Sequence, residues 1–185
     1  FGPRIDIEVG SRPSSVAIGD LDSDGLPDVA VVNFASATCS ILWNSGGGVL
    51  LRDPSKDIST VTQPSDLTIA DLDGDGKKDI VTAQSGIRVF RNLGGRTFAT
   101  STLFASSYTY TNVSTGDLNG DGKPDVVASS YGSANISVMM GLGQGGLAAN
   151  VQYSIGTPRA IAIRDFDGDL KADVVVAAGS SLNLY

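Results

Sequence analysis

The sequence predicts an all-β fold made of four copies of one unit, and three observations carry this prediction. Short runs of valine, isoleucine, leucine and alanine alternate with turn-forming residues, including 23 glycines in 185 residues. One acidic loop recurs four times, starting at residues 20, 71, 117 and 165. The spacing is therefore about 50 residues, as in known repeat architectures. A hydrophobic content of 41% with 18% charged residues suits a chain that folds as one domain, residues 1–185.

The first unit shows the expected order of elements. A short strand at 15–18 runs through Gly19 into the loop, and the continuous apolar run 29–32 leaves it as a buried strand. A third strand is expected at 41–44. Three consecutive glycines then turn the chain into a fourth strand near 49–51.

The other units repeat this order. We expect strands at 67–70, 80–83, 87–90 and 98–103 in the second unit, at 113–115, 126–128, 136–139 and 147–155 in the third, and at 160–163, 174–177 and 182–185 in the fourth. The fourth unit therefore lacks its fourth strand.

The second copy of the loop, residues 71–79, shows why it requires a metal ion. It places carboxylates at its first, third, fifth and ninth positions, which are Asp71, Asp73, Asp75 and Asp79. Carboxylates that converge on one point repel one another unless protons or a cation neutralise them. Because all the ligands are oxygens, we predict Ca²⁺, bound by these four side chains and by the backbone carbonyl of Lys77.

The loop differs from an EF-hand although both open with alternating aspartates. An EF-hand carries a glutamate at position twelve and lies between helices. Here position twelve is Thr82, and the apolar run 80–83 that follows the loop is typical of a strand. Gly76 lies where the loop must turn sharply.

The other three copies lie at 20–28, 117–125 and 165–173 and show two departures. Asn119 replaces an acid with a neutral oxygen donor, which predicts a modestly lower affinity. Leu170 replaces the turn glycine, so the fourth loop either holds a leucine in a left-handed conformation or turns differently. The fourth loop departs most from the pattern.

With these residues, the chain resembles the FG-GAP/VCBS repeat family, the calcium-loop β-propeller repeats also found in integrin α subunits. The resemblance covers essentially the whole chain. It implies a β-propeller of four blades with about four antiparallel strands each, in which the loop joins the first two strands of a blade. Because family propellers usually have about seven blades, it also allows a four-blade part of a larger propeller.

The resemblance also implies up to four Ca²⁺ ions and carries the ligand positions to every loop. In each loop the seventh residue would act through its backbone carbonyl and the others through their side chains. The implied ligands are Asp20, Asp22, Asp24, Leu26 and Asp28; Asp71, Asp73, Asp75, Lys77 and Asp79; Asp117, Asn119, Asp121, Lys123 and Asp125; and Asp165, Asp167, Asp169, Lys171 and Asp173.

The first ten residues predict how the propeller ends. Ile5, Ile7 and Val9 alternate with polar residues, as in a strand, and residues 1–10 match the segment that elsewhere connects one blade to the next. We therefore expect the N-terminal strand to complete the last blade. Pairing within the chain would close a four-bladed propeller, whereas pairing between chains would give a closed dimer or an open fibre.

Composition excludes several function classes. A net charge of −7 argues against nucleic acid, and fifteen of the twenty acidic residues lie in the loops. No apolar run is long enough for membrane insertion. The chain has no histidine, no Gly-x-Ser-x-Gly motif and no phosphate loop, and Cys39 is expected to be a small buried residue, so we predict no enzyme.

The function predicted is a calcium-binding, non-catalytic, extracellular binding or scaffold module, secreted or at the cell surface, with a protein or glycan partner. The alternative is a self-assembling structural protein that exchanges its N-terminal strand. A carbohydrate-binding lectin is disfavoured because the exposed-aromatic pattern of sugar sites does not recur: Trp43, Tyr108, Tyr110, Tyr131 and Tyr153 occupy different repeat positions and are expected in the core or in turns. Two glycosylation sequons start at Asn112 and Asn135 and matter only in a secretory pathway that glycosylates asparagine.

Overall fold

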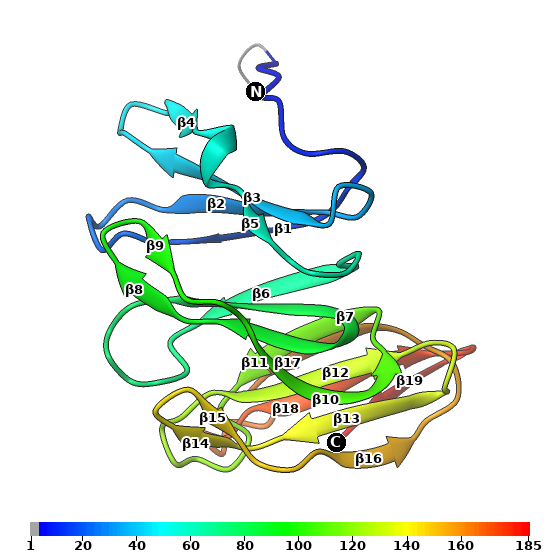
Figure 1. Ribbon diagram of the computed structural model, residues 1–185. Helices are drawn as coiled ribbons and strands as arrows, with labels where there is room; N and C mark the ends of the chain where they lie inside the picture. Colours follow the sequence, from blue (N-terminus) through cyan, green and yellow to red (C-terminus); the bar gives the residue numbers. More distant parts are fainter. Residues whose placement is uncertain (1–3) are drawn as a thin grey trace.

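Each repeat forms its own antiparallel β-sheet in the computed structural model, which describes residues 4–185 (Figure 1). We name these sheets 1 to 4 in chain order. Within the described range the chain contains strands, loops and one short 3-10 turn, η1 (Pro54–Lys56), and no α-helix. The all-β prediction is therefore confirmed. No helix among these residues has the length and apolarity needed to cross a membrane.

In sheets 1, 3 and 4 the strands lie side by side in chain order, and the first of them is the inner strand. Sheet 1 consists of β1 (Pro13–Gly19), β2 (Asp28–Asn33), β3 (Thr38–Asn44) and β4 (Leu50–Arg52), and β5 (Ile58–Ser59) also pairs with β3. Sheet 3 consists of β11 (Asn112–Gly116), β12 (Asp125–Ser130), β13 (Asn135–Met139) and β16 (Val151–Ser154). Sheet 4 consists of β17 (Pro158–Arg164), β18 (Asp173–Ala178) and β19 (Ser181–Leu184).

Sheet 2 contains β6 (Asp66–Ala70), β7 (Asp79–Phe90) and β10 (Thr102–Thr109). A straight strand with the 12 residues of β7 would be about 40 Å long. Yet the Asn92 backbone N–H reaches a carboxylate oxygen of Asp79 at 2.8 Å, so β7 must double back. The bend lies near Gly86, whose φ of 100° is a conformation that favours glycine. The two arms of β7 correspond to the two separate strands expected at 80–83 and 87–90.

Two small hairpins were not predicted as such. They are β8 (Asn92–Gly94) with β9 (Thr97–Phe98), and β14 (Gly141–Gly143) with β15 (Gly146–Leu147). The fourth strands expected at 98–103 and 147–155 are each divided, the first between β9 and β10 and the second between β15 and β16. Paired glycines at these turns, such as Gly94 and Gly95, take positive φ and reverse the chain early.

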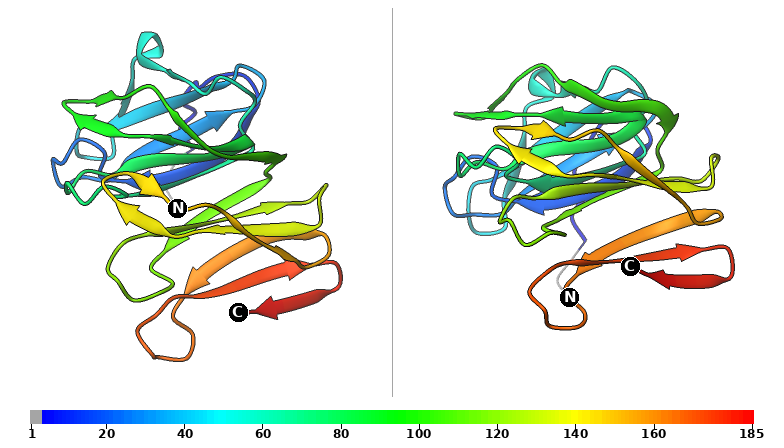
Figure 2. Two further views of the ribbon diagram at one scale, coloured as in Figure 1. Left: turned by 60° about the horizontal axis from the view of Figure 1, so that its bottom comes forward. Right: turned by 90° about the horizontal axis from the view of Figure 1, so that it is seen from below.

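The sheets stack in chain order (Figures 1 and 2), with inner strands β1, β6, β11 and β17 successive neighbours. One buried apolar cluster fills each interface. Ala30, Val32, Ile41 and Trp43 of sheet 1 meet Leu67, Ile80 and Phe90 of sheet 2. Val81, Ala83, Ile87 and Val89 meet Val113, Val126, Ala128 and Met139 of sheet 3. Val127, Ile136 and Val138 meet Val174, Val176 and Ala178 of sheet 4.

The second strands of sheets 2 and 3 are rich in apolar residues because both of their faces are buried. Ile80 faces sheet 1 while its neighbour Val81 faces sheet 3, and both are fully buried. Successive residues of a strand point to opposite faces, so a strand between two sheets needs an unbroken apolar run. Cys39 is likewise buried in the first interface, as predicted, and burial raises the pKa of its thiol to about 12.

The expected N-terminal strand is absent and does not complete the last blade. Residues 1–3 lie outside the described range, and residues 4–12 form no strand. The segment contacts sheet 1 instead: the Glu8 carbonyl accepts a hydrogen bond from Arg52 at 3.1 Å, and the Arg12 carbonyl accepts one from the Phe34 N–H at 2.8 Å. Sheets 1 and 4 lie at opposite ends of the stack (Figure 1), so no closed four-bladed ring forms.

Tyr110 replaces the proline that three repeats carry at the same position, and it is fully buried. Its hydroxyl lies 3.0 Å from the Ser137 hydroxyl of β13. Its backbone N–H donates to the Gln84 carbonyl at 2.8 Å, a bond that proline could not make. Tyr110 therefore joins sheets 2 and 3.

We expect Tyr110→Phe to lower the free energy of unfolding by about 1–2 kcal/mol, because the Ser137 hydroxyl loses a buried partner. Urea denaturation of the calcium-saturated protein measures this loss. Tyr131→Phe is the matched control, since this ring is half exposed and its hydroxyl lies 3.5 Å from Arg159. Equal losses in the two variants would contradict the assignment.

Candidate metal centres

All four acidic loops adopt one hydrogen-bonded conformation. Each joins the inner strand of a sheet to the second strand, and its first aspartate accepts two backbone N–H groups from within the loop. Asp20 accepts from Ser23 at 2.7 Å and from Gly25 at 2.9 Å. The corresponding bonds in the other loops link Asp71 to Gly74 and Gly76, Asp117 to Gly120 and Gly122, and Asp165 to Gly168 and Leu170. The sequence repeat is thus a structural repeat.

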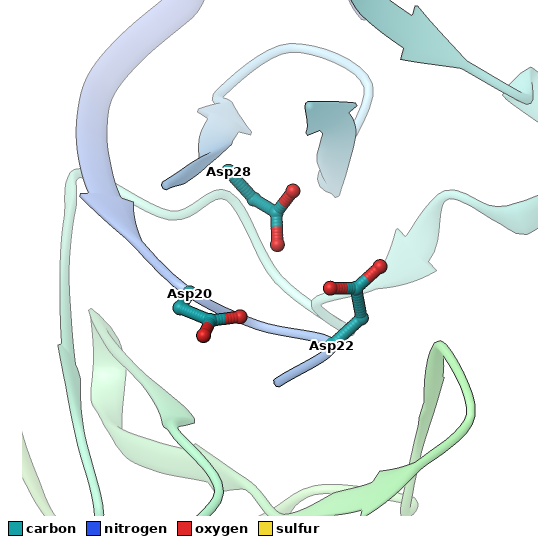
Figure 3. Close-up of side chains that lie close together, drawn as sticks. All are labelled: Asp20, Asp22 and Asp28. Atoms are coloured by element: carbon teal, nitrogen blue, oxygen red, sulfur yellow. The ribbon is translucent and has the colours of Figure 1, made fainter. Parts of the chain in front are cut away.

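Three loops bring three carboxylates together. One oxygen from each of Asp20, Asp22 and Asp28 lies within 4.8 Å of the other two, and these side chains face one another in Figure 3. The same holds for Asp71, Asp73 and Asp79, and for Asp165, Asp167 and Asp173. The first, third and ninth loop positions therefore converge. An all-carboxylate cluster of this size suits a hard cation, and Ca²⁺ accepts such oxygens in flexible geometry.

The third loop has the same fold with a lower charge. Asn119 stands at the third position, and its side-chain oxygen accepts the Asp121 N–H at 2.8 Å, as the aspartates do elsewhere. Desolvation alone would raise the pKa of Asp117, but the backbone N–H groups of Gly122, Gly120 and Asp121 hold that pKa below its ordinary value. This loop therefore keeps an ionised carboxylate at its first position and the hydrogen-bonded conformation of the other loops.

The fifth-position aspartates lie outside the three-carboxylate clusters. One oxygen of each accepts the N–H two residues ahead: from Leu26 to Asp24, Lys77 to Asp75, Lys123 to Asp121 and Lys171 to Asp169, at 2.8–2.9 Å. In the second loop the Lys77 ammonium also bonds the other oxygen of Asp75 and lowers its pKa. Metal ligation by these aspartates, and by the carbonyls of Leu26, Lys77, Lys123 and Lys171, stays a prediction.

The ninth-position aspartate has a second role that the sequence did not reveal. Asp28 is fully buried, and its two oxygens accept the N–H groups of Leu21 at 2.9 Å and Asn44 at 2.8 Å. Asp79 bonds Leu72 and Asn92 in the same way, and Asp125 bonds Leu118 and Gly141. Leu21, Leu72 and Leu118 are in the loops. Asn44 is the last residue of β3, and Asn92 and Gly141 lie two residues beyond β7 and β13. The aspartate therefore ties the loop to the third strand.

Burial raises the pKa of Asp79, and the negative charges of Asp73 and Asp71 raise it further. A bound cation would oppose both effects by stabilising the ionised form. The second loop therefore has an electrostatic reason to bind one.

Asn92 strengthens this junction and was also missed by the sequence analysis. Its side-chain amide donates to the Leu21 carbonyl of the first loop at 2.7 Å and to the Lys78 carbonyl at 2.9 Å. It thus connects the loops of two neighbouring sheets. The sequence did contain a hint of this contact, because the first two repeats both carry an asparagine at the end of their third strand, Asn44 and Asn92.

Two arginines pair with third-position aspartates. Arg96, in the hairpin of β8 and β9, bonds Asp22 of the preceding loop at 2.8 Å, and Arg91 bonds Asp73 at the same distance. The loops of sheets 1 and 2 are therefore partly neutralised by the protein itself. Among residues 4–185, Asp167 has no such ion pair. Of the three carboxylate clusters, the one in the fourth loop therefore has the least of its negative charge neutralised by neighbouring arginines.

The sequence left open whether the fourth loop holds Leu170 in a left-handed conformation or turns differently, and the structure shows the first. The φ of Leu170 is 71°, which is left-handed and close to the values of 85°, 86° and 80° at Gly25, Gly76 and Gly122. Its N–H donates to Asp165 at 3.0 Å, as the glycines do to their own first aspartate. The loop keeps its shape, and a leucine takes a conformation that costs about 1–2 kcal/mol for L-residues.

Comparison with protein families gives one match. The model for the FG-GAP-like repeat matches three consecutive segments, residues 20–82, 80–128 and 117–176. These segments contain all four acidic loops. A search of curated proteins found no match.

Solved structures with the same fold are β-propeller-like proteins of low sequence identity. An Agrocybe aegerita lectin, described for specific recognition of non-reducing terminal N-acetylglucosamine, is 19% identical with a TM-score of 0.65 over 91% of this chain and 48% of the lectin. BBS1N in complex with ARL6DN is 16% identical, with a TM-score of 0.66 over 96% of this chain and 51% of that one.

The Photorhabdus luminescens Tc holotoxin pore is 17% identical, with a TM-score of 0.56 over 91% of this chain and 9% of the toxin chain. The chain thus spans about half the length of the lectin and of BBS1N, and a small part of the toxin. At these identities the likeness concerns the fold alone.

We expect Leu170→Gly to raise the free energy of unfolding by up to about 1 kcal/mol, because glycine takes this conformation without a Cβ clash but loses more entropy on folding. The reverse change, Gly76→Leu, introduces the same strain into the second loop and should destabilise the protein by a similar amount. Thermal melting in calcium measures both. A stabilising Gly76→Leu would contradict the account.

Proposed function

Because the chain belongs to the family of FG-GAP-like repeats, we propose that it is a calcium-binding, non-catalytic binding module with a β-propeller arrangement. The single observation that carries this proposal is the fourfold recurrence of one loop conformation, with three carboxylates converging in three of the copies. A catalytic site is usually unique within a chain. Four equivalent sites are instead suited to a structural ion in every blade.

Each Ca²⁺ would be a structural ion that holds the loop to the second strand of its blade. Bound by the first, third and ninth positions, it joins the loop to the second strand. The ninth aspartate already joins the same loop to the third strand through its hydrogen bonds. A site filled at about 100 times its dissociation constant contributes about 2.7 kcal/mol to stability.

The remaining chemistry of the chain supports a non-catalytic function. There is no histidine to act as a general base at neutral pH, and Cys39 is buried with a raised pKa. Fifteen of the twenty acidic groups lie in the loops, where backbone N–H groups hold them. They are placed to hold a cation rather than to exchange protons with a substrate.

The binding surface we propose is the edge that carries the loops. Between the second and third loops lies an open hollow of about 670 Å³, lined by backbone and side chains that include Asp71, Asp117, Lys78, Lys123 and Gln144. Leu72, Pro124 and Leu142 also line it, and this mixture of charged, amide and apolar groups suits the surface of a protein partner. No aromatic side chain lines it, which favours a protein over a sugar ring.

The two propeller-like relatives support both classes of partner. The lectin recognises terminal N-acetylglucosamine, and BBS1N forms a complex with ARL6DN. A glycan partner for this chain would need aromatic platforms, and the half-exposed Tyr131 and Tyr153 lie outside the hollow. A protein partner at the loop edge is therefore our first choice.

We propose an extracellular location, secreted or at the cell surface, because Ca²⁺ is abundant there. The sequons bear on this proposal unequally. The Asn135 side chain is buried within β13, so the folded chain offers no room for a glycan at that position. Asn112 is half-buried, and its side-chain oxygen accepts a hydrogen bond from Ser129 at 3.2 Å.

Chelation tests the calcium proposal directly. We expect excess EDTA to lower the melting temperature by about 5 °C or more for each site emptied, because the structural ion is lost and the carboxylates repel one another. Metal analysis after dialysis against Ca²⁺ should find up to four ions per chain. An unchanged melting curve in EDTA would contradict a structural role for the ion.

Asp167→Asn tests one site while leaving the loop's hydrogen bonds in place, because an asparagine oxygen can still accept the Asp169 N–H. We expect weaker Ca²⁺ binding at the fourth loop, as predicted for Asn119 in the third, and a smaller calcium-dependent rise in melting temperature at limiting Ca²⁺. Asp53→Asn is the matched control, since Asp53 is exposed outside the loops and asparagine caps η1 equally well. Isothermal titration with CaCl₂ compares the affinities of the variants, and a binding curve for Asp167→Asn identical to that of the unchanged chain would exclude the fourth loop.

A further inference from the structure

We propose that Arg96 and Arg91 are built-in counter-ions of the first two acidic loops. Each neutralises the third-position aspartate of one loop when calcium is absent, and each lowers the affinity of that loop for Ca²⁺. The proposal rests on the calcium binding proposed above, and it adds what sets the strength of that binding. It starts from two ion pairs that the fold builds in the same way.

The two ion pairs have the same geometry. Nε and Nη2 of Arg96 bond one oxygen of Asp22, Oδ2, at 2.8 Å and 2.7 Å. Nε and Nη2 of Arg91 bond Oδ2 of Asp73 in the same way, and the Nε distance is again 2.8 Å. The second oxygen of each aspartate, Oδ1, accepts the backbone N–H two residues ahead, at 3.3 Å in the first loop and 3.2 Å in the second. Both oxygens of both aspartates therefore have a partner within the chain.

These partners oppose a metal ion at the third position. Asp22 and Asp73 each belong to a cluster of three converging carboxylates. A cation bound there either displaces the arginine, which breaks a charge-assisted hydrogen bond, or shares the carboxylate with a positive group that repels it. In both cases the arginine makes Ca²⁺ binding weaker than it would be at the same carboxylates alone.

The exposure of the four side chains shows which partner can leave. The side chains of Asp22 and Asp73 are 8% and 3% exposed, so each carboxylate needs a positive partner. The side chains of Arg96 and Arg91 are 48% and 47% exposed, and a guanidinium at that depth can turn into water at little cost. The aspartate is therefore fixed and the arginine is exchangeable, which suits a counter-ion that gives way to a metal.

The two arginines reach equivalent carboxylates from different places in the repeat. Arg96 lies in the turn between β8 and β9, and its counterpart in the turn between β14 and β15 is Gly145. Arg91 instead directly follows β7, and its side chain lies against Gly145. A Cβ at that glycine would be 3.1 Å from Cδ of Arg91 and 3.2 Å from Nε. Two sequence positions therefore supply one guanidinium to each loop.

Arg96 is also held by a contact outside the loop. Its guanidinium lies 4.9 Å from the centroid of the Trp43 ring, within the range of a cation–π interaction. Trp43 is buried in the interface between sheets 1 and 2. The packing of these sheets therefore helps to place the guanidinium beside Asp22, so the ion pair does not depend on the loop alone.

The third loop shows that the arginine accompanies the charge. Its third position is Asn119, which is neutral. The position that corresponds to Arg91 is Met140, and each of the two directly precedes the residue whose N–H bonds the ninth aspartate. With the ion pairs counted, the third position is electrically neutral in all three loops. This pattern is expected of arginines that compensate a carboxylate, and not of arginines that only pack between sheets.

Thermodynamic linkage adds a second effect. If an arginine lowers the affinity for Ca²⁺ by a given factor, bound Ca²⁺ lowers the contribution of that arginine to stability by the same factor. Each arginine therefore stabilises the chain mainly when calcium is scarce, where it offsets part of the repulsion among the carboxylates. The first two loops then stay folded at low calcium and fill as its concentration rises.

Isothermal titration of the calcium-depleted chain with CaCl₂ tests the proposal. We expect Arg96→Met to bind Ca²⁺ about 10-fold more tightly at one site, Arg91→Met to do so at a second site, and the double variant at both. The number of ions per chain should not change. Methionine keeps an apolar stem and packs well on the Trp43 ring, so these variants should fold, which circular dichroism checks.

Two further variants separate charge from packing. Arg96→Lys keeps a positive group and should bind Ca²⁺ less tightly than Arg96→Met, because the charge sets the affinity. Arg159→Met is the matched control, since Arg159 also lies over an aromatic ring, 5.0 Å from the centroid of Tyr131. It is near the start of β17, whereas the fourth loop follows the end of that strand. This control should leave the calcium affinities unchanged.

Melting curves give a second readout that packing alone would not move. Arg96→Met should lower the melting temperature more in EDTA than in saturating Ca²⁺, as linkage requires. An equal loss under both conditions would assign Arg96 a packing role and overturn the proposal.

Three titration results would overturn the proposal while leaving calcium binding in place. They are affinities in Arg96→Met and Arg91→Met that equal or fall below those of the unchanged chain, an Arg96→Lys variant that binds as tightly as Arg96→Met, and a control variant that gains as much affinity as the other two. An unchanged chain that binds no Ca²⁺ would instead overturn the proposed function itself. The two failures are therefore distinguishable.

Discussion

The buried aspartate at the ninth loop position is the interaction on which each repeat depends. In the first three repeats it accepts one N–H from the start of the loop and one from the end of the third strand. A carboxylate without hydrogen bonds would be costly at this depth, so the loop and the strand must both come to it. In the first two repeats the same group lies within reach of the first and third aspartates, which places the carboxylate cluster where the loop meets the second and third strands.

This arrangement makes the acidic loop part of the fold rather than an attachment to it. The hairpin of β8 and β9 extends the connection, because Arg96 and Asn92 reach from sheet 2 to the loop of sheet 1. If a cation binds there, its loss would destabilise the contacts between sheets 1 and 2 as well as the loop itself. These contacts would keep a binding surface at the loop edge rigid.

The sequence by itself determined the repeat, the position of the loops and most strands, because these follow from local patterns. The loops are marked by aspartates at fixed spacing, with Asn119 as the one exception, and the second strands by the apolar runs at 29–32, 80–83, 126–128 and 174–177. The leucine in place of glycine at position 170 limited the fourth loop to two alternatives, and a left-handed Leu170 was one of them. The tertiary structure decided what depends on distant residues: the bonds from Asp79 to Asn92, the arginines on Asp22 and Asp73, and the bend of β7 at Gly86. It also decided that Ile5 and Ile7 pair with no strand, because alternation shows that a segment can form a strand, whereas only the neighbouring chain surface provides the partner edge.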